Sequence, residues 1–184
     1  CEDEDTGQIL IDGDIEICKG LPTCPDFRLT TENTLGFGTS IVVRDDILII
    51  GSSLDSYFAD GEYNILSGSV IMYKKIVDDS LNESWVQSNR FYKNTNNQDG
   101  YHRYGASVDI NENKDIIVVG APGFNDRSGF GSVDIIEKNN EEWIQTTIEL
   151  PPNSVNSDSF GSVVCISGTT IVVGALQKEN IYIY

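Results

Sequence analysis

The amino-acid sequence predicts an all-β protein. Isoleucine, valine and tyrosine recur in short runs, while glycine, asparagine, aspartate and serine gather between the runs, as strands and turns require. No stretch of ten or more residues has the apolar spacing of an amphipathic helix. One pattern of an aromatic residue followed by glycine opens three similar segments of the 184-residue chain, which indicates an internal repeat.

The three copies of the repeat begin near residues 37, 104 and 160. Each copy opens with an apolar strand, turns through a short polar segment and continues into a second apolar strand that ends in glycine. The opening strands are 37–43, 104–110 and 160–166, and the second strands are 47–51, 116–120 and 171–174.

A third strand is expected at 68–73, 131–136 and 180–184, and a fourth strand opens at Trp85 and at Trp143 in the first two copies. Units of four short antiparallel strands have the anatomy of a β-propeller blade. The chain holds two whole blades and a third that stops after its third strand, about two and a half to three blades in all. Because a ring needs at least four blades, we expect a piece of a larger propeller.

The blades are expected to occupy residues 27–184, incomplete at the C-terminus. Residues 27–30 have the place of a fourth strand that completes a blade begun elsewhere in the sequence. Residues 1–26 form a separate cysteine-containing segment with a β-hairpin around Asp12-Gly13.

Glycine motifs bound each copy of the repeat. The openings are Phe37-Gly38, Tyr104-Gly105 and Phe160-Gly161, and the second strands end at Gly51, Gly120 and Gly174. With these motifs the chain resembles the FG-GAP repeat family, known from the propeller head of integrin α-subunits and from many secreted proteins. The resemblance covers roughly residues 27–184, although only the middle copy has the full Gly-Ala-Pro, at 120–122. It implies a secreted or cell-surface module for protein–protein interaction, adhesion or extracellular assembly.

The charge of the chain narrows the classes of partner. Aspartate and glutamate number 29 against 12 lysines and arginines, a formal net charge of −17. Nucleic acid and anionic membranes both require clustered basic residues, so neither is expected as a partner. No apolar stretch approaches the roughly 20 residues that span a bilayer, so no membrane insertion is expected in this segment. We expect other protein subunits, extracellular or cell-surface proteins, or glycans as partners.

One turn is a candidate calcium site. Integrin-like members carry, in some blades, a loop of the form Asp-x-Asp-x-Asp-Gly-x-x-Asp between the first two strands, whose alternate carboxylates bind Ca²⁺. The approximation in this chain is Asp109, Asn111, Asn113 and Asp115, which lacks the glycine. A polar hairpin turn is the reading that the sequence favours, and no other cofactor is expected.

Cysteines and one sequon point to an oxidising compartment. Cys1, Cys18 and Cys24 fall in the first 24 residues, and Cys18 and Cys24 are close enough for a small-loop disulfide. Cys1 and Cys165 are left unassigned; Cys165 lies in an apolar strand run, so a buried free thiol is at least as well supported as a bridge. Asn82 opens the sequon Asn-Glu-Ser and is a candidate for glycosylation.

Long loops with aromatic residues are candidate partner-binding sites, since aromatic side chains bring a large contact area at low entropic cost. The alternative is that they cap the edge of a blade. The candidates are Tyr57, Phe58, Asp60, Tyr63, Phe124 and Arg127.

Nothing in the sequence forms a catalytic constellation. The single histidine, His102, cannot supply an acid/base set, and no nucleophile motif or phosphate-binding glycine loop is present. We therefore expect a protein without catalytic activity. A carbohydrate-binding, lectin-like propeller and the accessory propeller of a larger secreted enzyme are the alternatives.

Overall fold

The computed structural model describes residues 10–11, 15–16, 28–29, 34–59, 62–64, 66–93, 101–123, 131–148 and 159–184. The chain divides into two compact units, Cys1–Thr34 and Leu35–Tyr184. We expected the blades to begin at residue 27, whereas the unit that contains them begins at Leu35.

The N-terminal unit contains one small antiparallel sheet with the strand order β1-β2-β3. Its strands are β1 (Leu10–Ile11), β2 (Ile15–Glu16) and β3 (Arg28–Leu29). β1 and β2 pair across the predicted hairpin. Arg28–Leu29, which we expected to complete a blade, pairs instead with the edge of β2 that β1 leaves open.

The first blade is a four-stranded antiparallel sheet with the order β4-β5-β8-β9. Its strands are β4 (Phe37–Arg44), β5 (Ile47–Ser52), β8 (Ser69–Val77) and β9 (Glu83–Tyr92). A two-stranded ribbon of β6 (Tyr57–Ala59) and β7 (Glu62–Asn64) lies in the connection between β5 and β8.

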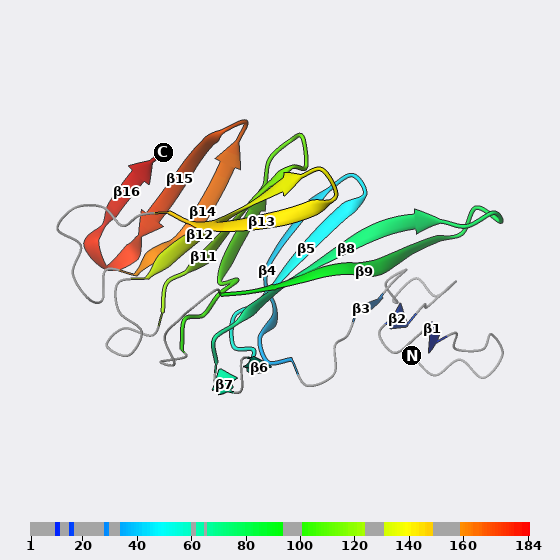
Figure 1. The fold of residues 1–184 in the computed structure, drawn as a ribbon, viewed down its shortest axis with the longest axis horizontal. Coiled ribbons are helices and arrows are strands. Elements are labelled where there is room, and N and C mark those ends of the chain that lie inside the picture. Colours follow the sequence, from blue (N-terminus) through cyan, green and yellow to red (C-terminus); the bar gives the residue numbers. More distant parts are fainter. Residues whose placement is uncertain are drawn as a thin grey trace, which may run out of the picture. The chain divides into compact units, whose positions relative to one another are not determined.

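The second and third blades repeat this order. The second is β10 (Ser107–Ile110), β11 (Ile116–Ala121), β12 (Ser132–Asn139) and β13 (Glu142–Thr147). The third is β14 (Phe160–Ser167), β15 (Thr170–Ala175), a short 3₁₀ turn η1 (Leu176–Lys178) and β16 (Asn180–Ile183). The three sheets stand beside one another in sequence order (Figure 1). This arrangement confirms the predicted all-β fold and its division into blades.

Adjacent blades pack face to face, with the opening strand of the later blade against the first two strands of the earlier one. β10 contacts β4 and β5, and β14 contacts β10 and β11. We call the face that a blade turns toward the next blade in sequence its back face, and the opposite face its front face. Each interface therefore joins the back face of one blade to the front face of the next.

Two apolar cores fill these interfaces. In the first, Ile49, Val70 and Met72 from the back face of the first blade meet Tyr104, Val108, Ile110 and Val119 from the front face of the second. In the second, Val118 and Val133 meet Phe160, Val164, Ile166 and Val173. Because adjacent residues of β11 serve different cores, this strand is apolar on both faces, which explains its unbroken run of isoleucine and valine.

The described part of the chain contains no helix that is long and apolar enough to cross a membrane.

Candidate interaction surface

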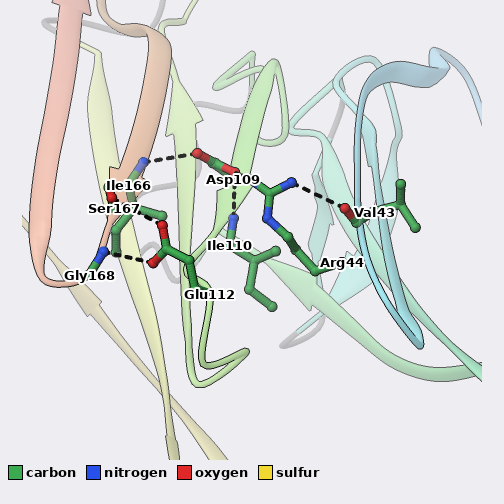
Figure 2. A network of polar contacts seen from close by, with 8 residues as sticks. All are labelled: Val43, Arg44, Asp109, Ile110, Glu112, Ile166, Ser167 and Gly168. Carbon is green, nitrogen blue, oxygen red and sulfur yellow. Dashed lines mark hydrogen bonds and ion pairs between the residues drawn. The ribbon is translucent and has the colours of Figure 1, made fainter.

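Polar side chains link the three blades near the turns that join the first two strands of each blade (Figure 2). Asp109 on β10 is the central residue of this network. Its Oδ2 accepts a hydrogen bond from the N–H of Ile166 on β14 at 2.9 Å, and its Oδ1 accepts one from the N–H of Ile110 at 2.9 Å. Oδ1 also lies 3.6 Å from Nη2 of Arg44 at the end of β4. One carboxylate therefore interacts with all three blades.

The turn of the second blade binds the turns of both neighbours. Glu112 accepts a hydrogen bond from the N–H of Gly168 at 2.8 Å and one from the hydroxyl of Ser167 at 3.0 Å. On the other side, Nζ of Lys114 lies 2.7 Å from Oδ1 of Asp46 in the turn of the first blade. The three turns are thus joined by one anionic and one cationic side chain of the second blade.

These contacts shift the pKa values of the groups that make them. The N–H of Gly168 is the main cause that holds the pKa of Glu112 below its ordinary value of 4.5. The hydrogen bond between Lys114 and Asp46 lowers the pKa of Asp46 below 3.8 and raises the pKa of Lys114 above 10.5. All three shifts favour the charged form, because the charged form makes the contact.

The side-chain amide of Asn111 fixes the conformation of the candidate calcium loop. Oδ1 of Asn111, which is buried, accepts hydrogen bonds from the N–H groups of Asp115 and Ile116, both at 3.1 Å. Nδ2 of Asn111 donates to Oδ1 of Asp115 at 2.7 Å, and Asn113 is exposed. The two carboxylate oxygens of Asp109 accept hydrogen bonds from the N–H groups of Ile110 and Ile166. The residues therefore form a polar hairpin turn, and within the described ranges no three His, Cys, Asp or Glu side chains gather as a metal site.

A buried ion pair that the sequence did not reveal joins the outer parts of the first and second blades. Nζ of Lys93, just after β9, lies 2.5 Å from Oδ1 of Asp134 on β12, and the two side chains are 7% and 0% exposed. Asp134 also accepts hydrogen bonds from Oγ1 of Thr147 at 2.8 Å and from Nε2 of Gln145 at 2.6 Å. The carboxylate is fully bonded, as a buried charge requires.

The predicted partner-binding loops are described only in part. The backbones of Tyr57 and Phe58 lie on β6 and that of Tyr63 on β7, so these residues share the two-stranded ribbon. Asp60, Phe124 and Arg127 lie outside the described residues.

The predicted modification sites fall in different parts of the chain. Cys1, Cys18 and Cys24 lie outside the described residues. Of the two alternatives left open for Cys165, the structure has the free thiol, but the side chain is exposed, so the expected burial is wrong. Asn82 is exposed in the turn between β8 and β9, where its Nδ2 donates to Oδ2 of Asp78 at 3.0 Å.

The back face of the third blade is apolar and exposed. The strand pairing makes Ile181 the equivalent of Val70 and Val133, because each lies opposite the glycine that ends the second strand of its blade. Val70 and Val133 are fully buried, whereas Ile181 is 72% exposed. Val163, Leu176 and Ile183 are exposed as well, and Val163, Cys165, Val172 and Ile181 line a depression on this face. The position of Cys165 on this face explains why its thiol is exposed.

The glycine that ends the second strand has room only in the third blade. A Cβ added at Gly51 would lie 2.0 Å from the carbonyl oxygen of Gly105, and one added at Gly120 would lie 2.0 Å from that of Gly161. At Gly174 the nearest atom would be Cβ of Val163, at 3.5 Å. In the first two blades this glycine admits the backbone of the next blade, and at Gly174 none of the described residues takes that space.

Comparison with known families agrees with this repeat structure. Residues 143–184, which contain nearly all of β13 and the whole third blade, match the model of the FG-GAP repeat. The chain carries an FG-GAP repeat. The match confirms the resemblance that the aromatic-glycine motifs suggested, and no curated protein matches the sequence. The exposed back face described above therefore belongs to the FG-GAP repeat itself.

The signal for this surface was present in the sequence but was not used. The alignment of the three copies already places Val163 where the other two copies have Ser40 and Ser107. Both serines make contacts between blades: Oγ of Ser40 donates to the carbonyl of Gly105 at 2.8 Å, and Oγ of Ser107 accepts from the N–H of Val164 at 3.0 Å. Valine at this position cannot make such a bond, so the back face of the third blade is more apolar than its equivalents.

Proposed function

We propose that this chain is a binding and assembly module without catalytic activity, and that the back face of its third blade is an interface. The observation that carries the proposal is the contrast between equivalent positions. Val70 and Val133 are buried by the following blade, while Ile181 is exposed in the third blade together with Val163 and Ile183. The back faces of the first and second blades each form an interface, so we expect the equivalent face of the third blade to form one too.

The free energy of burial supports this proposal. Covering an exposed valine, leucine or isoleucine side chain contributes about 1.5–3 kcal/mol. Val163, Leu176, Ile181 and Ile183 all lie in the third blade and are all more than half exposed. A contiguous apolar patch of this kind is typical of a surface that packs against another one.

The polar groups of the described residues support a module without catalysis. Asp55 pairs with Arg90 at 2.5 Å, Asp134 pairs with Lys93, and Asp109 bonds the backbone of two blades. These carboxylates are engaged in holding the fold together. Catalytic acids and bases are instead expected to face a cleft in which a substrate can reach them.

A location outside the cell or at its surface is part of the proposal. Residues 143–184 match the FG-GAP repeat, and such repeats are typical of secreted and cell-surface proteins. The sequon residue Asn82 is exposed in a turn, where a glycosylating enzyme can reach it.

The thiol of Cys165 offers a direct test, because it lies on the proposed contact face. Its rate of alkylation is measured by mass spectrometry in a native preparation from the source and again in the purified chain. We expect slower alkylation in the native preparation. Acylation of the exposed Lys138, on β12, serves as the control and should be equal in both. Equal alkylation of Cys165 in the two preparations would refute the proposal.

A further inference from the structure

The β8–β9 hairpin of the first blade is longer than the equivalent hairpin of the second blade. Trp85 pairs with a lysine of β8 and Trp143 pairs with a lysine of β12, so the two tryptophans occupy the same place in the repeat. Residues 76–84 close the first hairpin, whereas residues 139–142 close the second. The added length extends β8 and β9 beyond the β4–β5 turn (Figure 1). This extension is an addition to the blade that its repeat does not require.

The extension exposes apolar side chains on a face that already has a neighbour. Ile76 and Val86 are 50% and 44% exposed, and Leu81 in the turn is 83% exposed. Val86 lies in the same row of the sheet as Ile47, a residue of the first core, so Val86 and Ile76 are on the back face of the blade. The second blade packs on this face and leaves both of them uncovered. Their exposure therefore comes from the length of the hairpin.

The turn of the hairpin is held in one conformation by Asp78. Its Oδ1 accepts hydrogen bonds from the N–H groups of Ser80 and Asn82 at 2.8 and 2.9 Å, and its Oδ2 accepts one from Nδ2 of Asn82 at 3.0 Å. Leu81 has a φ of 63°, a left-handed conformation that is uncommon for leucine. A hairpin that is already fixed loses little conformational entropy when another segment binds to it.

Backbone hydrogen bonds alternate along β8 and β9, as in any antiparallel pair. The N–H of Asp78 donates to the carbonyl of Asn82 at 3.0 Å, which makes this a hydrogen-bonded pair. The alternation makes Lys75 and Trp85 a non-hydrogen-bonded pair. The N–H of Lys75 agrees with this, because it donates to the carbonyl of Asp46 on the other side of β8, at 2.8 Å. The N–H and C=O of Trp85 therefore point away from β8.

The same alternation gives the outer edge of β9 three open positions, at Glu83, Trp85 and Gln87. The register shifts at Ser88, which ends the regular run. No strand within the described ranges pairs with this edge. Blades pack through their faces, and β13 stays at the edge of the second blade although a blade lies on either side of it. Packing against further blades therefore does not use this edge.

We propose that the outer edge of β9 is a second interaction surface, where an extended segment of a partner protein adds a strand to the first blade. The segment pairs with the backbone of Glu83, Trp85 and Gln87, and it is apolar at its centre and basic at its ends. This surface is separate from the back face of the third blade, so the inference does not depend on that interface.

The side chains around the edge explain the apolar centre. A strand added to β9 places its side chains beside those of β9 on the same face of the sheet. On the back face they lie beside Val86, with Ile76 close to it. On the front face they lie beside Trp85, which is half-buried. Apolar side chains of the partner would thus cover exposed apolar surface on both faces.

The charges of the hairpin explain the basic ends. Asp78 and Asp79 are exposed in the turn, and Glu83, also exposed, opens β9. Lys75 lies 2.5 Å from Glu83, which leaves the two aspartates without a basic residue in the turn itself. The chain as a whole has a net charge of −17, which attracts a basic segment and repels an acidic one. Because salt screens this attraction, binding should weaken as the salt concentration rises.

Fluorescence anisotropy of a labelled synthetic peptide tests the proposal. The peptide alternates valine and threonine and carries lysines at both ends. The full chain is produced in a bacterial host, so that Asn82 has no glycan beside the edge. We expect saturable binding at low salt that weakens at high salt. The same peptide with proline at its centre, and one with glutamates in place of the lysines, are the controls and should each bind about tenfold more weakly.

Two variants at one position separate docking from folding. Gln87 is exposed and its N–H points away from β8, so Gln87→Pro removes an open donor and no hydrogen bond within the blade. It should weaken binding of the lysine peptide about tenfold. Gln87→Ala keeps the N–H and should bind like the wild type. Circular dichroism and thermal unfolding of both variants check that the blade is intact.

Hydrogen exchange of single amides, followed by NMR, locates the bound peptide. The N–H groups of Glu83, Trp85 and Gln87 should become protected when the lysine peptide is added. Those of Ser84 and Val86 already bond β8, so their exchange should change little. Protection at every second residue is the signature of an added strand.

The inference is overturned if the lysine peptide does not bind at low salt, if the proline peptide binds as tightly, or if Gln87→Pro binds like the wild type. Protection of other amides, with none at Glu83, Trp85 and Gln87, would place the peptide elsewhere and overturn it as well. Self-association of the chain that Gln87→Pro abolishes would assign this edge to a second copy in place of a basic partner.

Discussion

Gly120 is the position where a single methyl group should separate the blades. In Gly120→Ala, the new Cβ would lie 2.0 Å from the carbonyl oxygen of Gly161 and 3.0 Å from its carbonyl carbon. Ordinary contacts of this kind begin above 3 Å, and both obstructing atoms are backbone, so β14 must move by about 1 Å. Overpacking of this kind costs about 1–3 kcal/mol.

Gly174→Ala is the matched comparison, because it makes the same substitution where no blade follows. Its Cβ meets only ordinary contact at 3.5 Å, and alanine is more stable than glycine within a strand by about 0.5–1 kcal/mol. Since that gain applies to both variants, we expect Gly120→Ala to be less stable than Gly174→Ala by the overpacking cost, about 1–3 kcal/mol. Gly51→Ala, whose Cβ would meet the carbonyl of Gly105 at 2.0 Å, should behave like Gly120→Ala.

Urea unfolding followed by far-ultraviolet circular dichroism measures this difference. The measurement is made at a concentration where the wild type is monomeric, so that only contacts within one chain contribute. If Gly120→Ala proves as stable as Gly174→Ala, the blades do not approach one another through this glycine and the account of the interface fails.

Three further predictions concern charges and modification. Asp134→Ala leaves the Lys93 ammonium buried without this carboxylate, so the free energy of unfolding in urea should fall by about 3–5 kcal/mol. Replacing both Lys93 and Asp134 by apolar residues should recover most of this loss. The folded-state pKa of Glu112 is lowered by the N–H of Gly168, so this carboxylate stabilises the fold above pH 4.5 and the contribution is lost as the pH falls through the lowered pKa. In Glu112→Gln, the free energy of unfolding should therefore differ less between neutral and acidic pH than in the wild type. A carboxyl NMR titration that gives Glu112 a pKa at or above 4.5 would contradict this prediction. Secretion from eukaryotic cells should add a glycan at Asn82, seen as a mass shift that enzymatic deglycosylation and Asn82→Gln both remove.

The internal repeat made most of the fold predictable from the sequence. Strand order follows once three copies are aligned, since adjacent segments with short polar turns pair as antiparallel neighbours. The continuous apolar run in β11 also predicted burial on both faces, and Val118 and Val119 serve opposite cores. These are local properties of a repeat, which recur wherever its pattern recurs.

Contacts between distant segments were less predictable. Asp134 reads as a polar residue in a strand, and nothing near it in the sequence shows that Lys93 lies within bonding distance. That pairing depends on how closely two blades approach, which the glycine contacts determine. The same limit applies to Cys165: the apolar run around it predicts burial, but only the arrangement of the blades shows that its side chain lies on a face that no described residue covers.

Asp109 has a consequence for how mutations combine. Its carboxylate touches the strand that opens the third blade and lies beside an arginine of the first, so the two interfaces share a residue. Substitutions at separate interfaces normally have additive effects, but residues with a common partner do not. Damage to one interface should therefore change the cost of damage to the other while Asp109 is present. Without Asp109, the two costs should become independent, and the three blades would lose part of the cooperativity with which they unfold.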